Sequence, residues 1–168
     1  MNQSVMPPWV VLHVPHDSTW IPSEVRDQFV LTDEEIQNEI RLMTDHLTVD
    51  LFSGVLSNSS QLIRSPVSRL VVDVERFEDD KDEPMASRGM GAIYRMTSDQ
   101  QPLRRELTES EIEALMKTWY TPHHTRFENK VADILESHGT CLILDCHSFP
   151  SSALPYELQT EDRPRPDL

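Results

Sequence analysis

Two short aliphatic segments, each running into a histidine, constrain the fold of this chain more than any other feature. The segment from Leu142 to Ser148 is Leu-Ile-Leu followed by Asp, Cys, His and Ser, and the segment from Val10 to Ser18 has the same character. Such runs are typical of buried strands in a parallel sheet, and ligands collect at the carboxyl ends of those strands. We therefore predict that His16 and His147 belong to one site.

Small polar residues flank both histidines. Asp17 and Ser18 follow the first, and Asp145 and Ser148 surround the second. Taken alone, each histidine is more simply explained as a hydrogen-bonded structural residue. The repeated pattern favours function, because Asp17, Asp145 and Ser148 could orient ligating imidazoles from a second layer.

Charge and hydropathy exclude several classes of partner. The 168 residues include 15 basic and 29 acidic side chains, which gives a net charge of −14. This argues against nucleic acid, whose phosphates require Lys and Arg patches, and disfavours an anionic membrane surface. No apolar run is long enough for a transmembrane helix, and residues 1–8 lack the pattern of a signal peptide. We expect one domain over residues 1–168.

The two cysteines bear on whether the protein resides in a reducing or an oxidising cellular compartment. Cys141 and Cys146 lie in or beside one expected strand, five positions apart. This spacing places them on opposite faces of the strand, so they should not form a disulfide. Free thiols are typical of a reducing cytoplasm.

Capping boxes mark the starts of two helices. Thr32 to Glu35 opens a helix that should end near Gly54, and Thr108 to Glu111 opens another. A further helix should end at Gly139, a suitable C-terminal cap. Apolar residues spaced by three and four continue the first helix, at Ile36, Ile40, Met43, Leu47 and Leu51.

Strands are expected over residues 9–14, 61–64, 70–75, 92–94 and 141–146. The order of helices and strands indicates the α/β class, with a mainly parallel or mixed sheet flanked by helices. Residues 151–168 are rich in proline and show no periodicity, so we interpret them as a loop-like tail.

Metal binding is the leading hypothesis for the site. A catalytic zinc ion typically has three protein ligands and a water molecule, and His16 and His147 would supply two of them. Asp45 is the best remote candidate for the third. Helical periodicity, at about 100° per residue, argues against Asp45, because it falls opposite the apolar stripe of the expected helix. Asp50 lies nearer that stripe.

Other polar residues have weaker claims to the site. Asp73 lies inside an aliphatic run and must find an Arg or His partner, because a lone buried charge is costly. Arg69, Arg76 and Arg88 could each hold a carboxylate, although surface ion pairs are the commoner outcome. The pair His123-His124 cannot easily bind one metal, because adjacent helical residues point about 100° apart. A Ser-His-Asp triad is less well supported, since Ser18 and Ser148 lack a glycine-flanked elbow.

Five motifs, in order along nearly the whole chain, resemble the N-formylglutamate amidohydrolase family. They are Leu12 to Ser18, Thr44 to His46, Ser68 to Asp73, Gly89 to Tyr94 and Asp145 to Pro150. That family is similar in fold to zinc carboxypeptidases and aspartoacylases, which have a phosphorylase/hydrolase-like α/β fold. The resemblance implies zinc-assisted hydrolysis of a small anionic N-acyl amino acid, with release of formate and glutamate.

The resemblance also implies roles for particular residues. His16, Asp45 and His147 match the metal ligands, with Asp45 retained against the periodicity argument. Arg69 and Arg76 match positions that could hold the substrate carboxylates. A zinc-bound water would attack the formyl carbonyl while the metal polarises its oxygen.

One departure from the family pattern qualifies this prediction. Family members continue beyond the position of Leu168, and carboxypeptidase-like enzymes take their general-base Glu from that later region. We therefore expect the fold to be incomplete at its C-terminus and the base to lie outside this sequence. The alternatives are a truncated, inactive metal-binding or interaction protein of the same fold, and a different metallohydrolase such as a peptidase. The sequence leaves the acyl group and the oligomeric state open.

Overall fold

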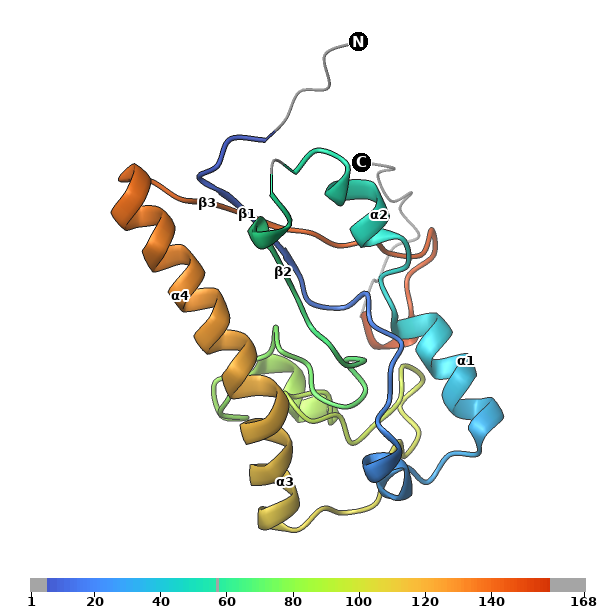
Figure 1. Cartoon of the computed structure of the whole chain (residues 1–168). Helices are drawn as coiled ribbons and strands as arrows, with labels where there is room; N and C mark the ends of the chain where they lie inside the picture. The colour runs from blue at the N-terminus through green and yellow to red at the C-terminus, as the bar shows by residue number, and fades with distance from the viewer. Residues whose placement is uncertain (1–5, 57, 158–168) are drawn as a thin grey trace.

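The computed structural model describes residues 6–56 and 58–157 (Figure 1). Its centre is a parallel sheet with the strand order β2-β1-β3. The strands are β1 (Val10–Val14), β2 (Leu62–Arg64) and β3 (Leu142–Asp145). The α-helices are α1 (Asp33–Met43), α2 (Thr48–Ser53), α3 (Glu109–Leu115) and α4 (Thr121–His138). The 3-10 helices are Ser23–Gln28, Ser59–Gln61, Pro84–Arg88 and Pro155–Glu157, and a π-helical turn, Met116–Tyr120, joins α3 to α4. The predicted α/β class is confirmed.

The two faces of the sheet are covered by different helices. Val10, Leu12 and Val14 pack on one face against apolar side chains of α2. Val11 packs on the other face with Ile134 of α4. Figure 1 shows α4 and α2 on opposite sides of the strands. This alternation explains why β1 is buried along its whole length.

The cysteines follow the same alternation. Cys146 packs in the cluster under α2, and Cys141 packs in the cluster under α4. Both are free thiols. The prediction of opposite faces and no disulfide is confirmed.

A larger hydrophobic core lies beside the sheet. It joins α1 to the segment from Val67 to Val74, to residues around Tyr94 and to the α3 region. The predicted strands at 70–75 and 92–94 are wrong, because these segments form turns and isolated bridges. The aliphatic run at 70–74 is buried, as its composition suggests, but against this second core and outside the ladder.

The capping boxes at Thr32 and Thr108 are confirmed, but the helix opened by Thr32 is shorter than predicted. It ends at Met43, and Leu47 adopts a left-handed conformation (φ 63°) before α2 begins. Residues 44–47 turn toward the sheet, where the Asp45 N–H donates a hydrogen bond to the carbonyl of His16 at 2.9 Å. Leu47 and Leu51 are consequently exposed and do not extend the apolar stripe.

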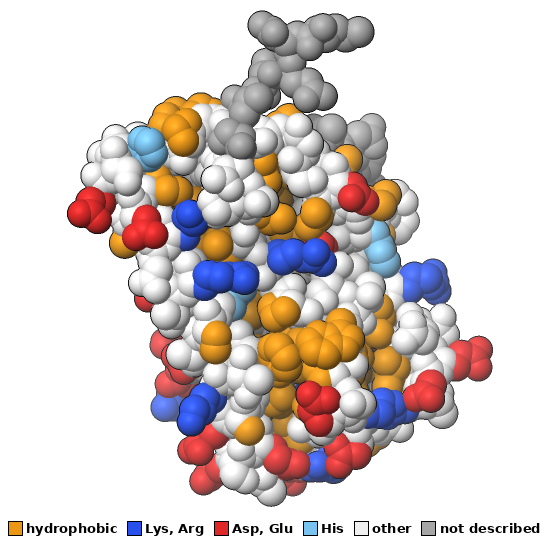
Figure 2. Space-filling view, in the orientation of Figure 1, with side chains coloured by type: hydrophobic (Ala, Val, Ile, Leu, Met, Phe, Trp, Pro, Cys, Tyr) orange, Lys and Arg blue, Asp and Glu red, His pale blue; other side chains and the backbone are white. Residues whose placement is uncertain are grey.

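The surface reflects the acidic composition. Figure 2 shows Asp and Glu side chains gathered at the lower end of the visible face, where Figure 1 places α3. β3 lies at one edge of the described sheet, and its Leu142 and Ile143 are 44% and 45% exposed. Among the described residues, no helix combines the length and apolar character needed to span a membrane. Most of the expected tail, residues 158–168, lies outside the described part of the chain.

Candidate metal centre

The ends of β1 and β3 bring His16 and His147 together. The two strands are paired in parallel, so the segments that follow them leave the sheet at the same edge. The imidazole centroids lie 5.3 Å apart. Both side chains line a cavity of about 420 Å³, together with Asp45, Arg69 and Glu75. The predicted convergence of the two strand ends is confirmed.

Asp45 lies between the two histidines. Its Oδ2 is 2.8 Å from Nδ1 of His147 and 3.9 Å from Nδ1 of His16. The backbone N–H of Ser148 donates to the same oxygen at 3.3 Å, and the Ser148 hydroxyl donates to the carbonyl of His46 at 2.8 Å. The break between α1 and α2 is what delivers this carboxylate, so the periodicity argument fails because the helix does not continue.

Behind His16 lies a fully buried carboxylate, Asp73. It accepts hydrogen bonds from Nε2 of His16 at 2.8 Å, from Nη2 of Arg69 at 2.8 Å and from the Tyr94 hydroxyl at 2.6 Å. The sequence predicted an Arg or a His partner for Asp73, and the structure provides both. His16 is therefore held by a rigid ionic network.

Glu75 is the site residue that sequence reasoning missed. Its Oε1 is 3.0 Å from Nε2 of His147, and its Oε2 is 3.4 Å from Nε2 of His16. The backbone N–H of Glu75 donates to Asp73 at 3.0 Å. A signal was available in the sequence, since Asp73-Val74-Glu75-Arg76 places three charges at the end of an aliphatic run.

The carboxylates create a strongly negative environment around the imidazoles. Burial lowers the pKa of His147, but hydrogen bonds to Asp145, Asp45 and Glu75 outweigh it and raise the pKa to about 12. Burial also opposes the charge on Asp73, yet Arg69 and His16 hold the pKa of its carboxyl well below the usual range. The same field that favours a protonated imidazole would favour a metal cation.

The donor atoms fit a divalent metal ion on one side of the imidazoles. Among the described residues, Nδ1 of His16 is buried and has no hydrogen-bond partner, whereas its Nε2 is held by Asp73. The ligating atoms of His16, Asp45 and His147 lie within 4.8 Å of one another. Two imidazoles and a carboxylate are a donor set that suits zinc. The open nitrogen of His16 points to the Asp45 side as the place for the ion.

The remaining predicted residues divide between the site and its surroundings. Asp145 lies 3.4 Å from Nε2 of His147 and accepts a hydrogen bond from Nδ1 of His13 at 2.8 Å. Asp17 forms an ion pair with Arg64 at 3.1 Å and does not line the cavity.

Two of the three candidate arginines, Arg69 and Arg76, lie on the Asp73 side of the site. Nη1 of Arg69 is 4.0 Å from Asp45, while Nε and Nη2 bond to Asp73. Nε of Arg76 is 3.6 Å from Asp73. Arg88 instead donates to the Tyr156 carbonyl.

The histidines of α4 lie away from the cavity. His123 approaches Nε2 of His13 at 3.0 Å, and Nε2 of His124 lies 2.9 Å from the Val74 carbonyl oxygen. The two rings stand at 78° to each other, which agrees with the argument that adjacent helical residues cannot share one ion. Neither is among the described groups that could hold a metal.

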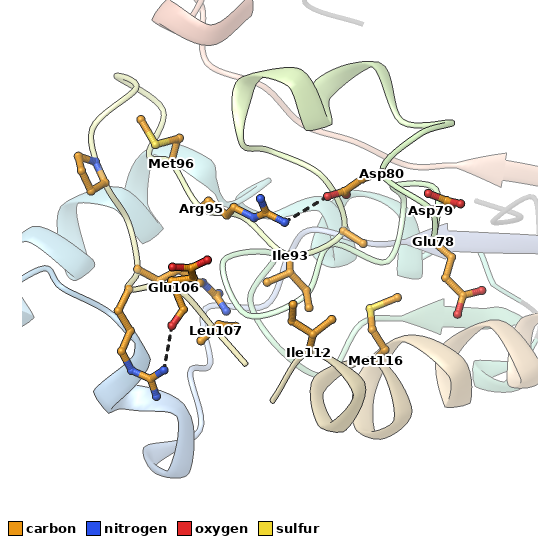
Figure 3. A pocket seen from close by; sticks show the side chains of 14 residues that line it. Glu78, Asp79, Asp80, Ile93, Arg95, Met96, Glu106, Leu107, Ile112 and Met116 are labelled. Atoms are coloured by element: carbon orange, nitrogen blue, oxygen red, sulfur yellow. Dashed lines mark hydrogen bonds and ion pairs between the residues drawn. The ribbon is translucent and has the colours of Figure 1, made fainter. Parts of the chain in front are cut away.

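A second cavity, of about 880 Å³, is larger but lacks such chemistry. Figure 3 shows Ile93, Ile112 and Met116 on its apolar side and Asp79 and Asp80 opposite. Its charged groups are partly paired already, as in the 3.5 Å contact between Arg95 and Asp80 drawn there. Among the described residues, no histidine or cysteine lines it, so we do not take it as the candidate site.

A family model described as N-formylglutamate amidohydrolase matches residues 9–168. No curated protein matches the chain.

Two solved structures are similar to the chain. The N-formylglutamate amidohydrolase from Ralstonia eutropha JMP134 has 21% identity and a TM-score of 0.79, over 94% of this chain and 59% of that one. A gene product from Agrobacterium tumefaciens has 20% identity and a TM-score of 0.58, over 86% of this chain and 54% of that one. The chain thus spans little more than half the length of either structure, and at these identities the likeness shows the fold alone.

Proposed function

Because the chain belongs to the N-formylglutamate amidohydrolase family, we propose that it is a metal-dependent hydrolase of N-formyl-L-glutamate or a related small N-acyl amino acid. The observation that carries this proposal is the convergence of His16, Asp45 and His147 on one cavity, with an open donor nitrogen on His16. Acidic composition and the match over residues 9–168 support a small-molecule substrate over nucleic acid.

His16, Asp45 and His147 would hold a zinc ion, which supplies a Lewis acid and lowers the pKa of water. Asp73 accepts from Nε2 of His16, so it fixes the ring with its other nitrogen free to bind. The Ser148 N–H donates to Oδ2 of Asp45 and helps to hold that carboxylate in place. These contacts hold the donors in place before any substrate arrives.

Arg69 and Arg76 would bind the carboxylates of the substrate. Nη1 of Arg69 is the terminal nitrogen that does not bond to Asp73, and Arg69 lines the cavity. Arg76 follows Glu75 and is partly exposed. Nη1 of Arg69 would donate to a substrate carboxylate in a charge-assisted hydrogen bond and so place the formyl amide near the histidines.

The test is formate release from N-formyl-L-glutamate by zinc-loaded protein. Release that is abolished in His147→Ala and retained in His138→Ala, a change of an exposed histidine at the end of α4, supports the proposal. Zinc binding with no turnover of any N-acyl amino acid would instead favour the inactive metal-binding alternative. Cleavage of peptides without cleavage of formyl-glutamate would favour a peptidase.

The two free thiols are consistent with a reducing compartment, and a cytoplasmic location is part of this proposal. Detection of the protein in a fractionated cell, with both thiols reduced, would test that part separately.

A further inference from the structure

We propose that Glu75 is a positioning residue that joins the two ligating histidines through their outer nitrogens. The inference rests on the proposed metal centre and concerns a residue that neither the sequence motifs nor the family match assigns. One carboxylate group lies against both imidazoles, with Oε1 3.0 Å from His147 Nε2 and Oε2 3.4 Å from His16 Nε2.

The two histidines need different degrees of support. His16 is 1% exposed, and its Nε2 is already held by the fully buried Asp73. The side chain of His147 is 30% exposed, and it follows the edge strand β3. Its Nε2 lies closer to Glu75 than to Asp145, at 3.0 Å against 3.4 Å. Glu75 is therefore the contact that ties the more exposed ring to the rigid one.

Glu75 is itself anchored. Its N–H donates to Oδ1 of Asp73, the same oxygen that accepts from His16. The chain of contacts runs from Asp73 through the Glu75 backbone to the Glu75 carboxylate and then to His147. These contacts help to hold the two rings in their present arrangement, with their planes at 46° to each other.

Glu75 lies at the Nε2 atoms of His16 and His147, and this position determines how it would influence metal binding. A carboxylate near Nε2 accepts the proton there and leaves the Nδ1 lone pair to a metal ion. Asp45 lies on the Nδ1 side of both rings, and Glu75 lies on the Nε2 side of both. The two carboxylates thus divide the roles of ligand and support.

A glutamine at this position cannot replace the carboxylate. Its amide has one acceptor oxygen, and its NH₂ group is a donor only. If the amide oxygen accepts from His147, the NH₂ group faces the Nε2–H of His16, so that two donors oppose each other. In the reverse orientation the NH₂ group opposes the Nε2–H of His147 instead. Glu75→Gln changes only this hydrogen-bonding capacity and one charge, with almost no change in volume.

The experiment measures Zn²⁺ and Co²⁺ dissociation constants by competition with a chelator, together with the Co²⁺ absorption spectrum. We expect Glu75→Gln to weaken binding by about 10–100-fold and to alter the Co²⁺ spectrum, which reports the ligand geometry. Glu78→Gln, an exposed change three positions on, should alter neither. The Tm of the metal-free variants checks that the fold is intact.

Asp145→Asn separates a joining role from simple charge. The substitution removes one negative charge near Nε2 of His147. Of the two ligating rings, Asp145 contacts only that of His147. A smaller effect of Asp145→Asn than of Glu75→Gln supports the proposal, and equal effects would overturn it. Unchanged metal affinity in Glu75→Gln would also overturn it while leaving the proposed hydrolase intact, whereas a wild-type protein that binds no metal would overturn both.

Discussion

Asp45 accepts a hydrogen bond from Nδ1 of His147 at 2.8 Å, although 102 positions separate the two residues in the sequence. This contact joins the turn between α1 and α2 to the loop that follows β3. The parallel pairing of β1 with β3 sets the loop after β3 beside His16, and the Asp45 N–H donates to the His16 carbonyl, so the turn and the loop meet at one edge of the sheet. The site thus depends on the tertiary fold. Substitutions in it can be tested both for their effect on metal affinity and for their effect on the free energy of unfolding.

We expect Asp45→Asn to reduce zinc affinity by more than the roughly 10–100-fold typical of residues behind the ligands. The amide keeps an acceptor oxygen but loses the charge that attracts the cation. Asp50→Asn, which changes an exposed carboxylate on α2, is the matched control. Chelator competition measures both variants, and a loss confined to Asp50→Asn would contradict the assignment of the third ligand.

Arg69→Met should destabilise the protein by about 3–5 kcal/mol, because it leaves the buried carboxylate of Asp73 without its guanidinium partner. Arg95→Met breaks only the exposed pair with Asp80, so it should cost about 0–1 kcal/mol. Urea unfolding of the metal-free proteins measures both changes. Similar losses in the two variants would mean that the Asp73 network contributes no more than a surface ion pair.

His123 should make the fold sensitive to acid. Burial, with smaller contributions from His13, His124 and Arg126, lowers its pKa from 6.5 to about 3. The unfolded chain therefore takes up a proton before the folded one does, and this stability is lost as the pH falls from about 6.5 toward 3. The loss at pH 4 should be on the order of 2–3 kcal/mol.

The check is the difference in unfolding free energy between wild type and His123→Gln at pH 7 and pH 4. Glutamine keeps a donor toward His13 but does not titrate in this range. A pH dependence that is as steep in the variant as in wild type would exclude His123 as the source. His138→Gln, which changes an exposed histidine, should leave the slope unchanged.

The two thiols should react at different rates. Burial raises the pKa of Cys146 to about 11, and its side chain is almost inaccessible, whereas Cys141 is partly exposed. Since the thiolate is the nucleophile, we expect iodoacetamide at pH 8 to modify Cys141 first, as located by peptide mass spectrometry. Equal rates in the folded protein would show that Cys146 is not protected, and both thiols should react in denaturant.

Local patterns predicted the elements whose causes are local. The aliphatic runs of β1 and β3 and the capping boxes at Thr32 and Thr108 depend on neighbouring residues, and all four are present. The strand expected at residues 70–75 failed because hydrophobic burial does not specify ladder pairing. Those residues are buried by the core beside the sheet.

The candidate site shows the same division. The convergence of His16 and His147 followed from the rule that parallel strands end at one edge. The position of Asp45 could not be derived from helical periodicity, because the break at Leu47 depends on tertiary contacts such as the hydrogen bond to His16. The charges around Glu75 marked the segment, but its role depends on where the two imidazoles lie, which only the tertiary fold determines.

The left-handed Leu47 has a thermodynamic consequence for metal binding. A non-glycine residue at φ 63° carries strain of about 1–3 kcal/mol, and the turn it closes is the one that presents Asp45. An ion held by Asp45 stabilises only chains in which this turn is formed, so at a concentration one hundred times its dissociation constant it would add about 2.7 kcal/mol to folding. Amide hydrogen exchange at residues 44–48 should therefore slow as zinc is added, which makes this turn a reporter of occupancy even in a variant that turns over no substrate.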